Sequence, residues 1–203
     1  MRELPRLITG RLVLRPFDLT DGPIVERLAG AREVADTTLT IPHPYPAGGG
    51  AHWIATHTAA WERGNNLALA ICDNMSTGEL LGAVSLQVSP VHAHGEIGYW
   101  IRLSSWGQGY ATEAACAVFQ YAFSHLHLHR VQGRHFARNA ASGRVLQKLG
   151  MKYEGTQRDA YRRWDRFEDV AVYSVLAPEW ALLSNSRLAS HPTNAEADKE
   201  TME

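Results

Sequence analysis

The chain has 203 residues, of which 45% are hydrophobic and 20% charged, and its formal net charge is −1. This composition is typical of a folded domain with a buried core and excludes a globally disordered chain. Because no run of about 18 apolar residues and no signal-type leader occur, the sequence predicts no membrane span and a cytoplasmic protein. The only cysteines, Cys72 and Cys116, exclude a disulfide framework.

The C-terminal end differs from the rest of the chain. Residues 184–203 hold two basic and four acidic residues and little that could be buried, which predicts a disordered polar tail. We therefore expect a single domain over residues 1–183, and without the tail its net charge is +1.

Hydrophobic periods of two and of 3.6 residues alternate along this domain. In chain order, the first half predicts a strand at 11–17, a helix at 18–33 capped by Asp21, and a Pro- and Gly-rich loop at 42–50. A second helix follows at 51–62, and then a pair of strands at 66–73 and 80–88. The second half predicts strands at 94–103, 130–137 and 169–176, with helices at 112–126 and 139–149 between them. Asn139 is the expected N-cap of the last helix, Gly150 ends it, and an extra strand is expected near 152–157. The order indicates an α/β fold with a mixed sheet flanked by helices.

The most informative segment runs from Gly98 to Glu113, where a strand enters a short turn and a helix follows at once. Gly107 and Gly109 lack a Cβ atom, so an anion could approach the backbone closely. The first turn of the helix adds free N–H groups and the positive end of the helix dipole. These features favour a cradle for a nucleotide-like cofactor, although an isolated Gly-x-Gly is more often only a tight connection.

The order of several short motifs resembles the GNAT superfamily of N-acetyltransferases, and within it the ribosomal-protein (RimJ/RimL-type) branch. The motifs are spread over residues 9–180 and include Thr9-Gly-Arg-Leu-Val-Leu-Arg15, Glu96-Ile-Gly-Tyr-Trp100, Trp106-Gly-Gln-Gly-Tyr-Ala-Thr-Glu-Ala114, Asn139-Ala-Ala-Ser142 and Lys148-Leu-Gly-Met151. The resemblance implies a mostly antiparallel central sheet, the acyl-CoA N-acyltransferase fold, with acetyl-CoA as co-substrate. It leaves a homodimer open.

The resemblance also implies which residues bind the cofactor. The backbone amides of Trp106, Gly107, Gln108, Gly109, Tyr110, Ala111 and Thr112 would hold the CoA diphosphate. The main chain of Ile101 and Leu103 would pair with the pantetheine arm, and Asn139 would reach that arm from the other side.

An activated thioester needs chiefly a neutral, well-placed amine. At pH 7 roughly one α-amine in seven is neutral, against roughly one lysine in 2,500. We expect Glu96 as the general base, or else as a strand-edge carboxylate in an ion pair. Ser142 is the expected proton donor to the thiolate, or else a serine of the first helical turn; Leu146 stands where many family members have a tyrosine.

The acceptor walls are expected in the 37–53 loop and the 159–167 segment, with Tyr45 and Tyr161 as candidate acceptor-binding residues. Tyr161 stands where the branch sometimes carries a second carboxylate. We expect no metal, because the alternating histidines at 125–129 lack a carboxylate or cysteine spaced to complete a site.

Residues 130–166 carry ten basic and three acidic residues. They could meet the CoA 3′-phosphate, an acidic protein or RNA, or simply form a solvated face. An acetyl-CoA-dependent N-acetyltransferase acting on a peptide N-terminus or a small amine is therefore the main hypothesis. A non-catalytic module that binds acyl-CoA or RNA is the alternative. We expect no membrane partner, and we do not expect nucleic acid as the main partner.

Overall fold

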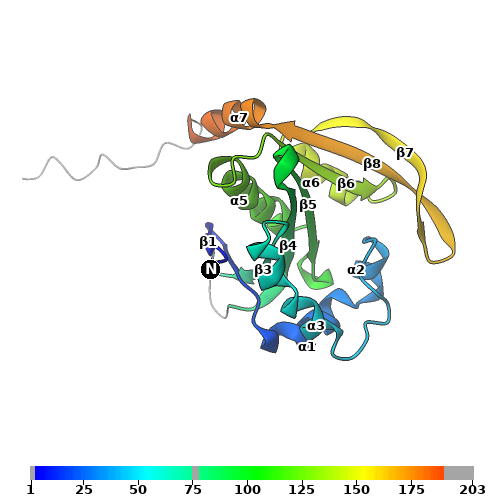
Figure 1. Ribbon diagram of the computed structural model, residues 1–203. Helices are drawn as coiled ribbons and strands as arrows, with labels where there is room; N and C mark the ends of the chain where they lie inside the picture. Colours follow the sequence, from blue (N-terminus) through cyan, green and yellow to red (C-terminus); the bar gives the residue numbers. More distant parts are fainter. Residues whose placement is uncertain (1–2, 75–77, 190–203) are drawn as a thin grey trace, which may run out of the picture.

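The computed structural model describes residues 3–74 and 78–189. An eight-stranded sheet with the order β1-β2-β3-β4-β5-β6-β8-β7 forms its centre (Figure 1). The strands are β1 (Leu7–Ile8), β2 (Leu12–Arg15), β3 (Asn66–Asp73), β4 (Leu80–Ser89), β5 (His94–Ile101), β6 (Arg130–Phe136), β7 (Lys152–Arg163) and β8 (Arg166–Leu176). All neighbouring strands are antiparallel except β5 and β6, which confirms the mostly antiparallel mixed sheet.

Helices cover both faces of the sheet. One face is covered by α1 (Gly22–Ala29), α2 (Arg32–Asp36) and α3 (Gly49–Ala55), whose apolar residues form a small core with Ala70, Ala83 and Trp100. The other is covered by α5 (Tyr110–Ser124), α6 (Ala140–Lys148) and α7 (Ala177–Ala189) around the main core. The helix α4 (His57–Glu62) contributes Trp61 to that core. No helix among the described residues is both long and apolar enough to cross a membrane.

Several predicted boundaries are confirmed, and others are wrong for identifiable reasons. Asn139 caps α6 by accepting the Ser142 N–H at 3.1 Å, and Gly150 follows that helix with a φ of 82°. The predicted helix 18–33 is interrupted around Gly30, where a Cβ atom would lie 2.3 Å from the Glu26 carbonyl oxygen. Asp21 precedes α1 but makes no cap, because its carboxylate accepts from Arg15 at 2.7 and 2.9 Å.

Other differences concern elements that the sequence pattern did not show. The predicted helix 51–62 is divided into α3 and α4 at Thr56, and β7 continues six residues beyond the predicted 157. β1 was not predicted, nor was α7, which extends to Ala189 and so into the first part of the expected tail. Residues 190–203 of that tail lie outside the described residues.

An uncharged histidine at the start of α4 is buried against α3 and the residues that follow β2. His57 is 5% exposed, its ring lies edge-on to Trp53 at 4.4 Å and Phe17 at 5.5 Å, and neither ring nitrogen has a hydrogen-bond partner within the described chain. Burial in these apolar surroundings lowers the pKa of His57 to about 4.

This histidine predicts a loss of stability in mild acid. Between pH 6.5 and 4 the unfolded chain binds a proton at His57 that the folded chain refuses, so the free energy of unfolding falls as the pH drops. We expect His57→Phe to remove about 1–2 kcal/mol of the loss between pH 7.5 and pH 5, measured by urea unfolding. Equal losses in both proteins would show that His57 does not carry this effect.

Candidate active site

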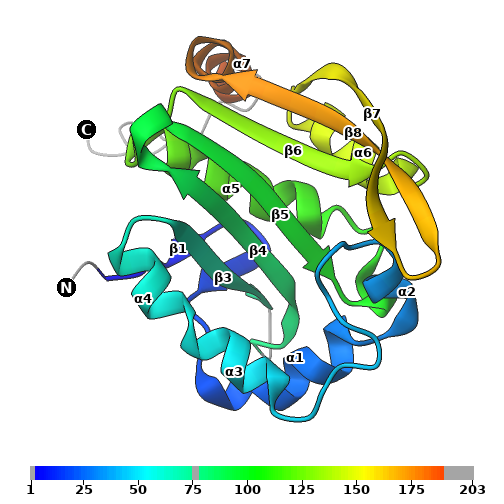
Figure 2. The ribbon, with the colours of Figure 1, turned by 45° about the vertical axis from the view of Figure 1, so that its right-hand side comes forward.

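A cleft of about 1150 Å³ opens where two parallel strands separate. β5 and β6 pair only from His94–Arg130 to Ile97–Gly133, and beyond this point the strands diverge (Figure 2). β5 continues to pair with β4 as far as Ile101, so its opposite edge has no strand partner along the fork. Extended backbone without a partner offers N–H and C=O groups to an elongated ligand.

The glycine turn forms the end of the cleft at the start of α5. Gly107 and Gly109 have φ values of 75° and 84°, which glycine adopts without strain. The first helical hydrogen bond runs from the Glu113 N–H to the Gly109 carbonyl, so the three amides of Tyr110, Ala111 and Thr112 have no acceptor within α5. Six of the seven residues predicted to form the cradle line the cleft: Trp106, Gly107, Gly109, Tyr110, Ala111 and Thr112. The turn is suited to an anionic diphosphate.

Three of the residues predicted to contact the cofactor have polar groups that already form hydrogen bonds within the fold. Leu103 belongs to a 3₁₀ turn outside the cleft lining, and its carbonyl already accepts the Trp106 N–H at 3.2 Å. Gln108 also lies outside the lining, and its side chain donates to the Ser104 carbonyl at 3.2 Å. Ile101 lines the cleft, but the Trp106 indole N–H already donates to its carbonyl at 2.6 Å.

Arg11, in the turn between β1 and β2, supports the glycine turn, a role that the sequence did not indicate. Its Nη1 donates to the Gln108 carbonyl at 3.1 Å, and its Nε and Nη2 each lie 2.7 Å from Glu113 Oε2 in the first turn of α5. Since the Gln108 carbonyl points at Arg11, the N–H of the same peptide unit, that of Gly109, points the opposite way. Arg11 thus fixes the orientation of one cradle amide.

On the α5/α6 side of the fork, a tyrosine and a serine face each other. Ser142 lies in the first turn of α6 and its Oγ is 2.9 Å from the Tyr99 hydroxyl of β5. Burial raises the pKa of Tyr99 to about 12, although the bond to Ser142 lowers it. Both residues line the cleft together with Asn139. Tyr99 belongs to the Glu96–Trp100 motif, but the sequence does not mark it as a site residue, because its partner Ser142 is 43 positions away.

On the opposite face of β5, Glu96 takes part in a charged network. Arg134 Nε and Nη2 lie 2.9 and 2.8 Å from Glu96 Oε1, and Gln132 Nε2 donates to Oε2 at 2.7 Å. Arg134 Nη1 also donates to the Tyr161 hydroxyl at 2.5 Å, and Glu96, Arg134 and Tyr161 all line the cleft. The structure therefore shows the ion pair that was the alternative for Glu96, at a place that an acceptor amine could reach.

The cleft is also lined by the loop between α2 and α3 and by Tyr161 of the β7–β8 hairpin, which belong to the two segments predicted as acceptor walls. Tyr45 lines the cleft there, and burial, with a smaller contribution from Glu26, raises its pKa. Arg163 joins the two walls, because its 7% exposed side chain donates to the carbonyls of Ala35, Leu39 and Ile41 at 2.6, 3.2 and 2.7 Å. The predicted acceptor segments are thus brought together by a residue that sequence reasoning assigned to the basic stretch.

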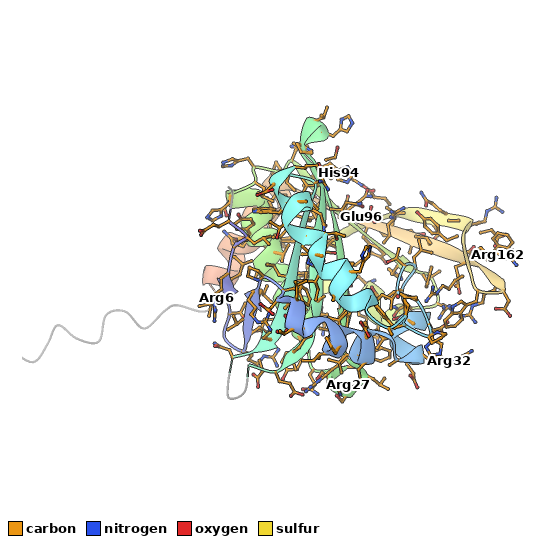
Figure 3. All side chains as sticks on the ribbon, turned by 60° about the horizontal axis from the view of Figure 1, so that its bottom comes forward. Arg6, Arg27, Arg32, His94, Glu96 and Arg162 are labelled. Atoms are coloured by element: carbon orange, nitrogen blue, oxygen red, sulfur yellow. The ribbon has the colours of Figure 1, made fainter. Side chains whose placement is uncertain are left out.

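The basic stretch does not form one patch. At least six of its ten cations hold acids or backbone carbonyls, including Arg130 with Glu154, Arg138 and Arg166 with Asp36 and Glu168, and Lys152 with Glu179. Arg144 and Lys148 line the cleft, whereas Arg162 lies on the outer part of the hairpin, far from Glu96 (Figure 3). Within the described ranges, no three His, Cys, Asp or Glu residues are grouped to hold a metal ion.

Comparisons with known proteins agree with this geometry. Residues 11–152 match the family model described as "Acetyltransferase (GNAT) domain". The chain is 32% identical to "Uncharacterized N-acetyltransferase YoaA" of Bacillus subtilis over 126 residues, which are 62% of this chain and 71% of that protein. It is 29% identical to the "[Ribosomal protein uS5]-alanine N-acetyltransferase" of Escherichia coli over 84 residues, 41% of this chain and 43% of that protein. Mycobacterium smegmatis RimJ, solved with a CoA-disulfide, shares the fold with a TM-score of 0.78 and 22% identity over 92% of this chain and 93% of that one.

The position of Arg11 predicts a selective effect on diphosphate binding. We expect Arg11→Ala to raise the Kd for CoA on the order of 10-fold, since the Gly109 amide loses its fixed direction. Pantetheine, which lacks the diphosphate, should bind both proteins equally in calorimetry. Arg27→Ala, on α1 and outside this cleft, is the matched control. A parallel loss of affinity for pantetheine would contradict the assigned role.

Proposed function

Since the chain belongs to the GNAT acetyltransferase family and is an acetyl-CoA-dependent acyltransferase, we propose that its acceptor is the α-amine at the N-terminus of a polypeptide. The amine would attack the thioester directly while both substrates are bound. The observation that carries the choice of acceptor is the charge of the cleft lining.

Direct attack is supported by the division of the site across β5. Successive side chains of a strand point to opposite faces, so Glu96 lies on one face of β5 and Tyr99 on the other. An amine on the Glu96 side and a thiolate leaving toward Ser142 would be on opposite sides of a thioester held in the fork. Neither Cys72 nor Cys116 lines the cleft, so no described thiol is placed to carry the acetyl group as an intermediate.

An α-amine is supported by the acids and cations of the lining. Glu96 is the one carboxylate among the described lining residues, and Arg134 already neutralises it. Arg134, which is paired with Glu96, also lines the cleft, so a polyamine with several positive charges would meet a cation there and find no further carboxylate among the described lining residues. The remaining polar lining offers hydroxyl and amide groups that suit an uncharged peptide backbone, from Thr37, Thr38, Thr40, Asn65, Asn66, Ser85 and Gln87. The name of the E. coli relative points to the same class of acceptor.

The chain's own residues would then divide the work. The amides of Tyr110, Ala111 and Thr112 bind the diphosphate, and Asn139 offers its Nδ2 to the pantetheine arm, because the helix cap uses only its Oδ1. Glu96 accepts the proton of the attacking amine on the lone pairs that its two donors leave free. Tyr45 and Tyr161 contact the acceptor.

A thiol-release assay with acetyl-CoA tests the acceptor class. We expect peptides with a free α-amine and an uncharged first side chain to be acetylated much faster than spermidine. They should also react faster than the same peptides when the N-terminus is blocked and a lysine is the only amine. Mass spectrometry would locate the acetyl group on the α-nitrogen. Faster turnover of spermidine would refute the α-amine proposal.

The alternative, a non-catalytic module that binds acyl-CoA or RNA, makes a different prediction in the same assay. It would bind CoA without releasing thiol from any amine. The basic stretch gives this alternative little support, because most of its cations are used inside the fold.

The role of Glu96 can be tested by its pH dependence. We expect Glu96→Gln to lower kcat/KM on the order of 10- to 100-fold, with the largest fall at low pH, where neutral amine is scarce. Glu62→Gln, an exposed change on α4 outside the cleft, is the control for loss of a negative charge. An unchanged pH profile in Glu96→Gln would leave Glu96 only its ion pair with Arg134.

A further inference from the structure

We propose that Tyr99 is a positioning residue for departure of the CoA thiolate: its hydroxyl donates to Ser142 Oγ and so directs the Ser142 proton toward the thioester sulfur. The inference rests on the acetyl transfer proposed above. It does not depend on the acceptor, because the same thiolate leaves acetyl-CoA whichever amine attacks.

The two hydroxyls are held by independent elements. Tyr99 extends from β5 within the main core, and its oxygen lies 2.9 Å from Ser142 Oγ at the start of α6. The Ser142 backbone is fixed in turn, because its N–H donates to Asn139 Oδ1 at 3.1 Å. The pair therefore joins the strand to the helix beside the fork.

The direction of the hydrogen bond follows from chemistry and distance. A phenol is more acidic than an aliphatic hydroxyl, so Tyr99 is the better donor and Ser142 Oγ the better acceptor. The Tyr99 hydroxyl also donates to the Ser142 carbonyl at 3.3 Å, and its one hydrogen can be shared between this carbonyl and Oγ, which is the nearer acceptor at 2.9 Å. With a pKa of about 12, Tyr99 keeps its proton throughout the physiological range and acts as a permanent donor. The Ser142 hydrogen is then left for another acceptor.

The thiolate is the acceptor that the reaction provides. As the amine nitrogen bonds to the carbonyl carbon, the C–S bond breaks and its electron pair goes to sulfur. Ser142 stabilises this charge by donating a hydrogen bond and keeps its proton, and Tyr99 likewise remains neutral. The proton lost by the amine passes through Glu96 to solvent, and the released thiolate takes up a proton from solvent.

Steady-state kinetics of single and double variants test this positioning role. We expect Tyr99→Phe to lower kcat on the order of 10-fold with an unchanged KM for acetyl-CoA, and Ser142→Ala to lower it at least as much. The double variant should be no slower than Ser142→Ala, because Tyr99 acts only through that hydroxyl. Tyr153→Phe, which removes an exposed hydroxyl bonded to Thr156 outside the cleft, should retain the full rate. Multiplicative losses in the double variant, or full activity of Tyr99→Phe, would overturn the inference.

A nearly isosteric replacement guards against a variant that fails to fold. With 3,5-difluorotyrosine at position 99 the phenol loses its proton at lower pH, and a phenolate cannot donate to Ser142. We expect the ratio of its kcat to that of wild type to fall with rising pH above neutrality; a constant ratio would refute the role. Absence of thiol release by wild type with every amine would refute the proposed function instead, so the two failures are distinguishable.

Discussion

The cleft depends on how closely α6 packs against the point where β5 and β6 separate. Leu146 is 1% exposed, and a Cβ atom on Gly133 would lie 2.8 Å from its Cδ2 and 3.1 Å from Ile97 Cγ2. Glycine at 133 therefore lets the helix approach the last paired residues of the two strands. Ser142 precedes Leu146 by four residues and lies on the same side of α6, so this packing also places the Ser142 hydroxyl beside β5.

β5 carries the two sets of proposed catalytic groups on its opposite faces. Ile97 and Tyr99 belong to the main core under α5 and α6, and Trp100 belongs to the smaller core under α1–α3, with Glu96 on the same side. A single strand thus separates the carboxylate proposed to take up the amine proton from the hydroxyls proposed to stabilise the thiolate. The β4 pairing along the whole strand keeps this arrangement rigid.

Arginine side chains join the two segments predicted as acceptor walls. Asp36 of α2 accepts from Arg138 and Arg166, and both arginines also bind the buried carboxylate of Glu168 on β8. Together with Arg163, these bonds attach α2 and the following loop to the β7–β8 hairpin. A bidentate guanidinium paired with carboxylates gives directional bonds that a solvated charge would not, so the two predicted walls are held in place.

The sequence alone determined the features that short-range chemistry controls. The strand at 66–73, the Asn139 cap and the positive-φ glycines at 107 and 109 follow from hydrophobic period, side-chain capping and the missing Cβ, all of which act within a few residues. Only the tertiary structure decided which distant groups meet. Arg11 reaches Glu113, Tyr99 reaches Ser142, and the basic stretch is dispersed into ion pairs, because these contacts depend on strand order and helix packing, which local sequence patterns do not encode.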